Sequence, residues 1–329
     1  MLISRGNRVK HILTLVLTLG TSAAAQARDL IWDTRLHKGY TVDEFVSERQ
    51  GGEILVFGER HATKDNRGER EIIEHHTNQV RLLERLTAIK RETRIQTGME
   101  FLTYDKQDAV DQFLADALPE EQFLKIVDWG ATPFELYRQQ ILIPRQSGGR
   151  TLALNIPRAL ATHVAKKGPE SLSAEERQSL PPIWERGRGD YFERFREAMA
   201  EHATPAQIEN FFWAQSLWDD TMAWNALRNT DNKALTVILV GEFHVEYGQG
   251  LPDRLRRHGA TKVTTLLQLE TESVETEELE RLTAPDSRYG ERADYIWLHV
   301  IGPAHVKSGN LRAKTLPRAK FLAGSNWLQ

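Results

Sequence analysis

Short apolar runs alternate with longer stretches of helical periodicity along most of this chain. Four runs carry a clear strand signal, because each is short, apolar and closed by a Gly or Asn with a polar cluster. Two later runs follow a similar pattern, so we predict a central sheet. In chain order the runs are residues 53–57, 94–99, 150–154, 234–240, 262–269 and 295–300.

The stretches between these runs show the spacing of helices. Residues 68–90 form a charged amphipathic helix, whose apolar side starts at Ile73 and includes His76. This position favours a packed histidine over a ligand. Residues 206–229 form a second helix that is unusually aromatic.

Parallel strands need long crossover connections, and helices are the usual ones. Because helical stretches separate the runs, we predict an α/β fold with a mostly parallel central sheet covered by helices. A helical insertion, at about residues 160–230, lies between the third and fourth strands. We expect residues 28–329 to form a single α/β domain, with a C-terminal extension at about residues 270–329.

The first 27 residues have the order of a secretory signal peptide. Three basic residues precede an apolar run at 12–19, and a small-residue stretch offers cleavage after Ala25 or Ala27. The run is too short to span a membrane, which takes about 20 apolar residues. No later segment approaches that length, so we expect a soluble periplasmic or secreted protein without an integral membrane segment.

The composition limits the kinds of ligand and cofactor site that the chain can form. The 329 residues contain 43 Lys and Arg against 46 Asp and Glu, so no overall positive charge favours nucleic acid. The complete absence of cysteine excludes disulfides, thiolate nucleophiles, Cys-bound zinc, iron–sulfur clusters, covalently attached haem and a lipid-modified N-terminal cysteine. Any metal or haem must therefore be held by His, Tyr, Met or carboxylate side chains.

Two copies of a Gly-Glu-x-His motif follow strand runs, at residues 58–61 and 241–244. Glu100 and Asn155 follow two other runs. Ligands of open α/β sheets bind beyond the carboxyl ends of the strands, so these side chains converge if their strands are neighbours. The alternative is that each Gly turns the chain and each His caps the following helix.

Two kinds of site fit these motifs, because serine-hydrolase, phosphate-loop, dinucleotide and His-Glu-x-x-His motifs are absent. In a metal-dependent hydrolase, His61, His244 and Glu100 would hold Zn, Mn or Fe, with Glu59 or Glu242 as the general base. In a haem-binding protein, His, Tyr or Met would ligate the iron and the aromatic helix would supply an apolar wall.

Other residues bear on the choice between these sites. Gln215, Asp219 and Met222 share one stripe of the aromatic helix, which suits either a pocket wall or a core helix. Tyr247 lies in a Gly-rich loop after the second motif, and a phenolate can ligate haem iron. The alternative for Tyr247 is a surface tyrosine packed on its own loop.

Together these residues resemble the ChaN-like haem-binding proteins, whose superfamily includes the Tiki and TraB metal-dependent proteases and the erythromycin esterases. The resemblance spans about residues 54–269 and depends on the order of several blocks. These are 58–61, 98–101 with Gln107 and 113–114, 154–158, 214–223 and 244–252.

The resemblance implies an α/β fold, non-covalent haem binding in iron or haem uptake, and a haem pocket that two subunits can form together. It implies a tyrosine as axial ligand, for which Tyr247 is the best match and Tyr191 or Tyr137 are poorer ones. It also implies that His or Lys from the partner holds the propionates. His61, His244, Gln215 and Met222 complete the expected haem site.

The chain departs from the family pattern in two ways. Family members are often lipoproteins, which the missing cysteine excludes here. The second motif reads Gly-Glu-Phe-His at residues 241–244, closer to the metalloprotease pattern, so the hydrolase remains the alternative.

Overall fold

A computed structural model describes residues 29–271 and 274–300 of the chain. The predicted signal peptide at 1–27 and the end of the expected C-terminal extension lie outside the described residues. Within the described part, no helix has both the length and the apolar character needed to cross a membrane.

The described residues form an eight-stranded sheet in the order β2-β1-β8-β7-β3-β6-β4-β5. The strands from β8 to β5 are parallel, and β1 and β2 extend the β8 edge in antiparallel pairing. The predicted mostly parallel sheet is confirmed, whereas β1 and β2 were not predicted. The strands are β1 (Leu30–Asp33), β2 (Lys38–Tyr40), β3 (Ile54–Glu59), β4 (Ile95–Thr103), β5 (Thr151–Asn155), β6 (Leu235–Gly241), β7 (Val263–Thr271) and β8 (Tyr295–Val300).

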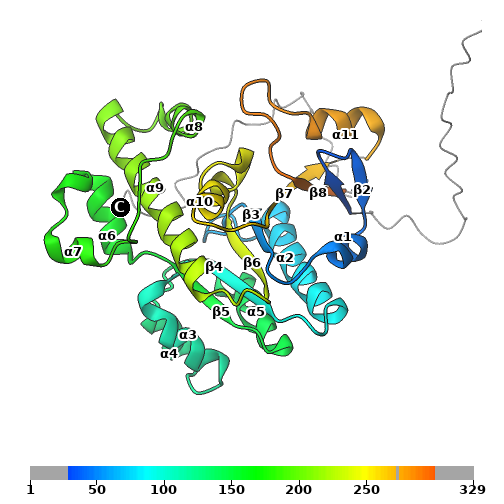
Figure 1. Ribbon diagram of the computed structural model, residues 1–329, viewed down its shortest axis with the longest axis horizontal. Coiled ribbons are helices and arrows are strands. Elements are labelled where there is room, and N and C mark those ends of the chain that lie inside the picture. Colours follow the sequence, from blue (N-terminus) through cyan, green and yellow to red (C-terminus); the bar gives the residue numbers. More distant parts are fainter. Residues whose placement is uncertain (1–28, 272–273, 301–329) are drawn as a thin grey trace, which may run out of the picture.

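Helices cover both faces of this sheet (Figure 1). Every residue of β3, β5 and β6 is buried, as expected for parallel strands covered on both sides. On one face the core includes residues of α1 to α5, and on the other face residues of α9 and α10. The helices are α1 (Val42–Glu48), α2 (Arg70–Ile89), α3 (Gln107–Leu114), α4 (Glu120–Ile126), α5 (Arg138–Leu142), α6 (Arg158–Lys167), α7 (Ala174–Gln178), α8 (Asp190–Met199), α9 (Pro205–Asn229), α10 (Leu251–Arg257) and α11 (Thr276–Thr283).

Helix α2 confirms a predicted helix but turns its apolar face slightly differently. Ile73 is 42% exposed, and its neighbour Ile72 packs in the core instead. His75 and His76 are both buried, although adjacent helical residues point in different directions. Both can be buried because they have different partners: His75 contacts the Arg60 backbone just after β3, and His76 packs against the ring of Tyr137.

The predicted helical insertion connects β5 to β6 along the chain and comprises α6 to α9. Its longest helix, α9, starts at a capping box in which Thr204 and Gln207 satisfy each other's backbone groups. The same helix packs along β5, where the Asn225 side-chain amide donates to the Leu154 carbonyl at 2.8 Å. The insertion therefore packs directly on the sheet.

The order of the strands brings the two Gly-Glu-x-His motifs together. Strand β3 pairs with β6 in parallel, with Glu59 opposite Gly241. Strand β4 lies on the other side of β6 and carries Glu100. The ends of three neighbouring strands thus meet at one edge of the sheet, where doubly wound folds bind their ligands.

Candidate functional site

The site is centred on Glu100, which lies between the histidines of the two motifs. Its carboxylate is 3.4 Å from His61 Nε2 through one oxygen and 3.6 Å from His244 Nε2 through the other. The backbone N–H of Gly241 donates to the first of these oxygens at 2.7 Å. The structure therefore brings His61, His244 and Glu100 together, as the sequence analysis expected if the strands were neighbours.

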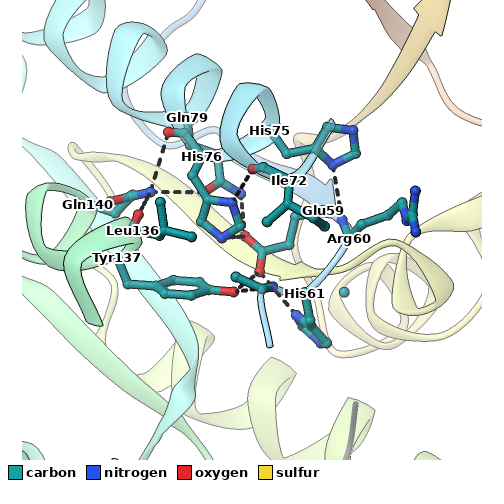
Figure 2. A network of polar contacts seen from close by, with 12 residues as sticks. Glu59, Arg60, His61, Ile72, His75, His76, Gln79, Leu136, Tyr137 and Gln140 are labelled. Carbon is teal, nitrogen blue, oxygen red and sulfur yellow. Dashed lines mark hydrogen bonds and ion pairs between the residues drawn. The ribbon is translucent and has the colours of Figure 1, made fainter. Parts of the chain in front are cut away.

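Each histidine has a second, buried carboxylate on its far side. On the β3 side, His61 Nδ1 is 3.0 Å from Glu59 (Figure 2). Glu59 also accepts hydrogen bonds from the Tyr137 hydroxyl at 2.7 Å and from Gln79 at 2.6 Å. His76 Nε2 lies 3.7 Å from the same carboxylate. Elements β3, α2 and α5 therefore hold Glu59, and Glu59 orients His61.

The other histidine is held in a similar way by the helical insertion. His244 Nδ1 is 2.6 Å from Asp219 of α9. Asp219 accepts from the Tyr191 hydroxyl at 2.8 Å, and the Gln215 amide lies 3.0 Å from both Tyr191 and His244. The result is a chain of contacts with Glu100 at its centre and a buried tyrosine at each end.

These contacts set the protonation of the site. Burial opposes charge on both histidines, but the adjacent carboxylates outweigh it and raise the pKa of His61 to about 10 and of His244 to about 9. Burial also opposes ionisation of Glu100, yet the two imidazoles hold its pKa well below the usual range. At neutral pH the site therefore holds charged pairs, which can bind a polar ligand or exchange protons with it.

The tyrosines are fixed in their protonated form. Burial and the neighbouring carboxylates hold the pKa values of Tyr137 and Tyr191 well above the usual range. Both hydroxyls donate to carboxylates, so neither phenol is free to ligate iron as a phenolate.

Gly241 is needed for this arrangement because a side chain would collide with His61. A Cβ atom at position 241 would lie 2.7 Å from His61 Nε2 and 3.1 Å from Cε1. The ring of His61 thus packs directly against the backbone of the second motif. The glycine allows both the close approach and the hydrogen bond to Glu100.

A cavity of about 190 Å³ opens beside His61 and Glu100 at the ends of β4 and β5. Its walls include three aromatic side chains, those of Phe101, Trp129 and Trp218, and the ring of Phe101 packs edge-on against His61 at 4.8 Å. The full lining is His61, Glu100, Phe101, Thr103, Trp129, Gly130, Ala131, Thr132, Asn155, Ile156, Arg158, Thr162 and Trp218.

Several of the predicted site residues lie outside this lining. His244 and Gln215 are buried behind it, and Met222 packs in the core between α9 and the sheet. Tyr247 is half-buried and packs against the ring of Tyr289 at 5.2 Å. Tyr247, the predicted iron ligand, therefore lies outside the cavity.

Glu242 likewise points away from the two histidines. Its carboxylate lies 3.8 Å from Arg292, which forms a closer pair with Glu246. Burial and the adjacent Glu246 raise the pKa of Glu242 to about 7, against the effect of Arg292. Glu59, the other candidate base, is held by hydrogen bonds and paired with His61.

The divalent-metal alternative gains no support from the geometry. In the described part of the chain, no three His, Asp or Glu side chains are arranged to hold a metal ion. His61, His244 and Glu100 contact one another as ion pairs instead.

Sequence reasoning missed some residues at the cavity. Arg158 follows the β5 run and the Asn-Ile-Pro segment, so the strand-end rule could have identified it. Trp218 belongs to a block quoted for the resemblance, without a role. Trp129 lies in a loop after α4, where no periodicity pointed to it.

His75 contacts the first motif without facing the cavity. Its Nδ1 accepts a hydrogen bond from the Arg60 backbone N–H at 3.0 Å, so its other ring nitrogen carries the proton when the ring is neutral (Figure 2). Burial lowers the pKa of His75 to about 3, so the ring is neutral in the folded protein. His75 therefore anchors the backbone that leads into His61.

Comparison with known families gives one match that spans most of the chain. Residues 45–255 match the family model described as haem-binding uptake, Tiki superfamily, ChaN. No curated protein matches the sequence significantly.

One solved structure shows the same fold, and others are less similar. A structure titled "Cofacial heme binding to ChaN of Campylobacter jejuni" superposes with a TM-score of 0.60 at 14% identity, covering 83% of this chain and 97% of that chain. An erythromycin esterase mutant in its open conformation gives a TM-score of 0.44 at 11% identity, covering 87% and 99%. An effector domain of a Vibrio vulnificus toxin gives 0.38 at 16% identity, covering 70% and 36%.

Replacing Gly241 with alanine should displace His61. The new Cβ would lie 2.7 Å from the imidazole, so we expect a loss of about 1–3 kcal/mol in unfolding free energy, as for other overpacked sites. Urea denaturation measures the loss, and the His61 ring signals in NMR report the displacement. Gly68→Ala is the matched control, because no atom lies within 4 Å of its Cβ position. Equal stability and unchanged His61 signals in both variants would contradict the close contact.

Replacing His75 with asparagine should reduce the sensitivity of stability to acid. His75 stays neutral in the folded state down to about pH 3, while in the unfolded chain it binds a proton below its usual pKa of 6.5. Its contribution to stability is therefore complete above pH 6.5 and falls as the pH drops toward 3. Asparagine keeps an acceptor near the Nδ1 position but binds no proton.

Between pH 6 and 4, we expect the wild type to lose up to about 1.4 kcal/mol more per pH unit than His75→Asn. Denaturation curves at several pH values measure the difference. Parallel losses in the two proteins would show that His75 binds a proton equally well in the folded and unfolded states.

Proposed function

Because this chain belongs to the ChaN family of haem-binding uptake proteins in the Tiki superfamily, we propose that it binds haem at the carboxyl ends of the sheet strands. The observation that carries the proposal is the aromatic cavity next to His61. The binding is non-covalent, since the sequence has no cysteine for thioether attachment.

The residues around the cavity fit haem in two respects. Phe101, Trp129 and Trp218 provide flat apolar surface, which a tetrapyrrole ring needs. His61 provides an imidazole that lines the cavity, and its side chain is 26% exposed. Imidazole is a common ligand of haem iron.

We assign the iron contact to His61 in preference to Tyr247. Tyr247 lies outside the cavity lining, whereas His61 is part of it. His61 is held in its protonated form by Glu59 and Glu100. Metal ligands bind without that proton, so haem that binds through His61 displaces it.

The size of the cavity bears on how a bound haem is covered. Its volume of about 190 Å³ is below the roughly 300–1,000 Å³ that encloses a typical organic ligand. Much of a haem at this position would remain outside the cavity. We therefore propose that a second copy of the chain covers the exposed face.

We propose further that the protein is exported and acts in haem or iron uptake. The signal-like order of residues 1–27 and the description of the family support this role. The sequence has no cysteine for a lipid anchor, which supports a free protein in the periplasm or outside the cell.

Haemin titration tests haem binding. We expect a saturable Soret shift with the wild type, and His61→Ala should weaken binding roughly tenfold or more and move the band, since an axial ligand is lost. Tyr247→Phe should leave the spectrum unchanged. Far-UV circular dichroism controls for folding of both variants, and sedimentation of the haemin complex should report two copies.

The variants separate the two candidate ligands. A Soret change in Tyr247→Phe but not in His61→Ala would move the haem to the Tyr247 surface. No saturable shift with the wild type would reject haem binding altogether, and a monomeric complex would reject the shared site.

Export is tested by the mass of the mature protein. After expression with an intact N-terminus, the protein recovered from outside the cytoplasm should begin at residue 26 or residue 28, as cleavage after Ala25 or Ala27 requires. An intact chain starting at Met1 would contradict the assignment.

A further inference from the structure

Arg158 differs from the other arginines of this protein. It is exposed at the start of α6, immediately after β5, and it lines the cavity. Within residues 29–271 and 274–300, every other arginine makes a hydrogen bond, an ion pair or a ring contact. Arg158 makes none of these.

The cavity lining offers Arg158 no free anion. Glu100 is the one carboxylate in the lining, and it is already bound to both histidines and to the Gly241 backbone. The side chains of Thr103, Thr132, Asn155 and Thr162, which also line the cavity, are uncharged. A cation therefore lines the cavity without a partner among the described residues.

The backbone next to Arg158 leaves room for its head group. Gly130 has a φ of +75°, and a Cβ there would lie 3.5 Å from an Arg158 nitrogen. Residues other than glycine rarely adopt this backbone conformation, so the position favours glycine. The cavity thus has a cationic rim at Arg158, aromatic walls and the polar group of His61 and Glu100.

We propose that Arg158 binds an ionised carboxylate of the ligand, and that this carboxylate is a propionate of haem. The planar guanidinium donates two parallel hydrogen bonds to a carboxylate, which the unpaired side chain is free to make. The inference rests on the proposed haem-binding function. It assigns a propionate contact to the same chain that supplies His61, in addition to any contact from a second copy.

The arrangement also predicts selectivity. The aromatic walls accept any tetrapyrrole, whereas Arg158 distinguishes a free acid from its ester. The ester has no charged oxygen to pair with Arg158, so it forgoes the charge-assisted hydrogen bonds that the free acid makes. Arg158 is thus a specificity-determining residue of the cavity.

The test compares haemin with haemin dimethyl ester, both titrated by absorbance in the same detergent-containing buffer. The wild type should bind haemin about tenfold to a hundredfold more tightly than the ester, the range expected for a charge-assisted hydrogen bond. In Arg158→Gln this ratio should fall to about one, through weaker binding of haemin and not of the ester. Arg158→Lys should restore part of the preference, since it keeps the charge.

Arg67→Gln serves as the matched control, because Arg67 is exposed and pairs with Glu135 outside the cavity. It should keep the wild-type ratio. A merely structural role for Arg158 would change both affinities equally, so an unchanged ratio in Arg158→Gln overturns the inference while haem binding stands. If the wild type binds neither compound, the proposed function and this inference both fail.

Discussion

The ion pairs of Glu100 with His61 and His244 are the contacts on which the site depends. Taking charges out of water costs several kcal/mol per ion, and only close, well-oriented partners compensate for it. Glu100 belongs to β4, and the two histidines follow β3 and β6. The three strands must therefore lie side by side and in register before Glu100 can pair with both histidines. Loss of Glu100 would leave each histidine with one carboxylate, Glu59 or Asp219.

Two separate parts of the fold stabilise the two histidines by the same arrangement of side chains. Each histidine is backed by a buried carboxylate, and each carboxylate accepts from a buried tyrosine. One pair, Glu59 with Tyr137, comes from the end of β3 and the residue that precedes α5. The other, Asp219 with Tyr191, comes wholly from the helical insertion. The insertion is thus an integral part of the site.

The cavity is where these parts meet. Trp129 comes from the connection between β4 and β5, Trp218 comes from the insertion, and Arg158 from the first turn of α6. Rigid helices and strand ends thus position aromatic, polar and cationic groups around one opening. Such a combination favours a flat ligand with a charged edge, which is the chemical character of haem.

Local sequence patterns were enough to predict the strands of the parallel sheet, the helical insertion and the position of both motifs at strand ends. Continuous apolar runs and strand-end glycines are local patterns, so they can be recognised in the sequence alone. It missed β1 and β2, which are short and pair at the edge of the sheet, and it placed Ile73 on the wrong side of α2.

Which of the candidate residues meet depends on the tertiary structure. Glu100 contacts the two histidines because β4 lies next to β6. Glu242 and Tyr247 follow β6, as His244 does, but they contact Arg292 and Tyr289 instead. Likewise, only the fold leaves Arg158 without a partner while the other arginines of residues 29–271 and 274–300 have one. Pairings between distant segments depend on strand order and register, and no local pattern encodes them.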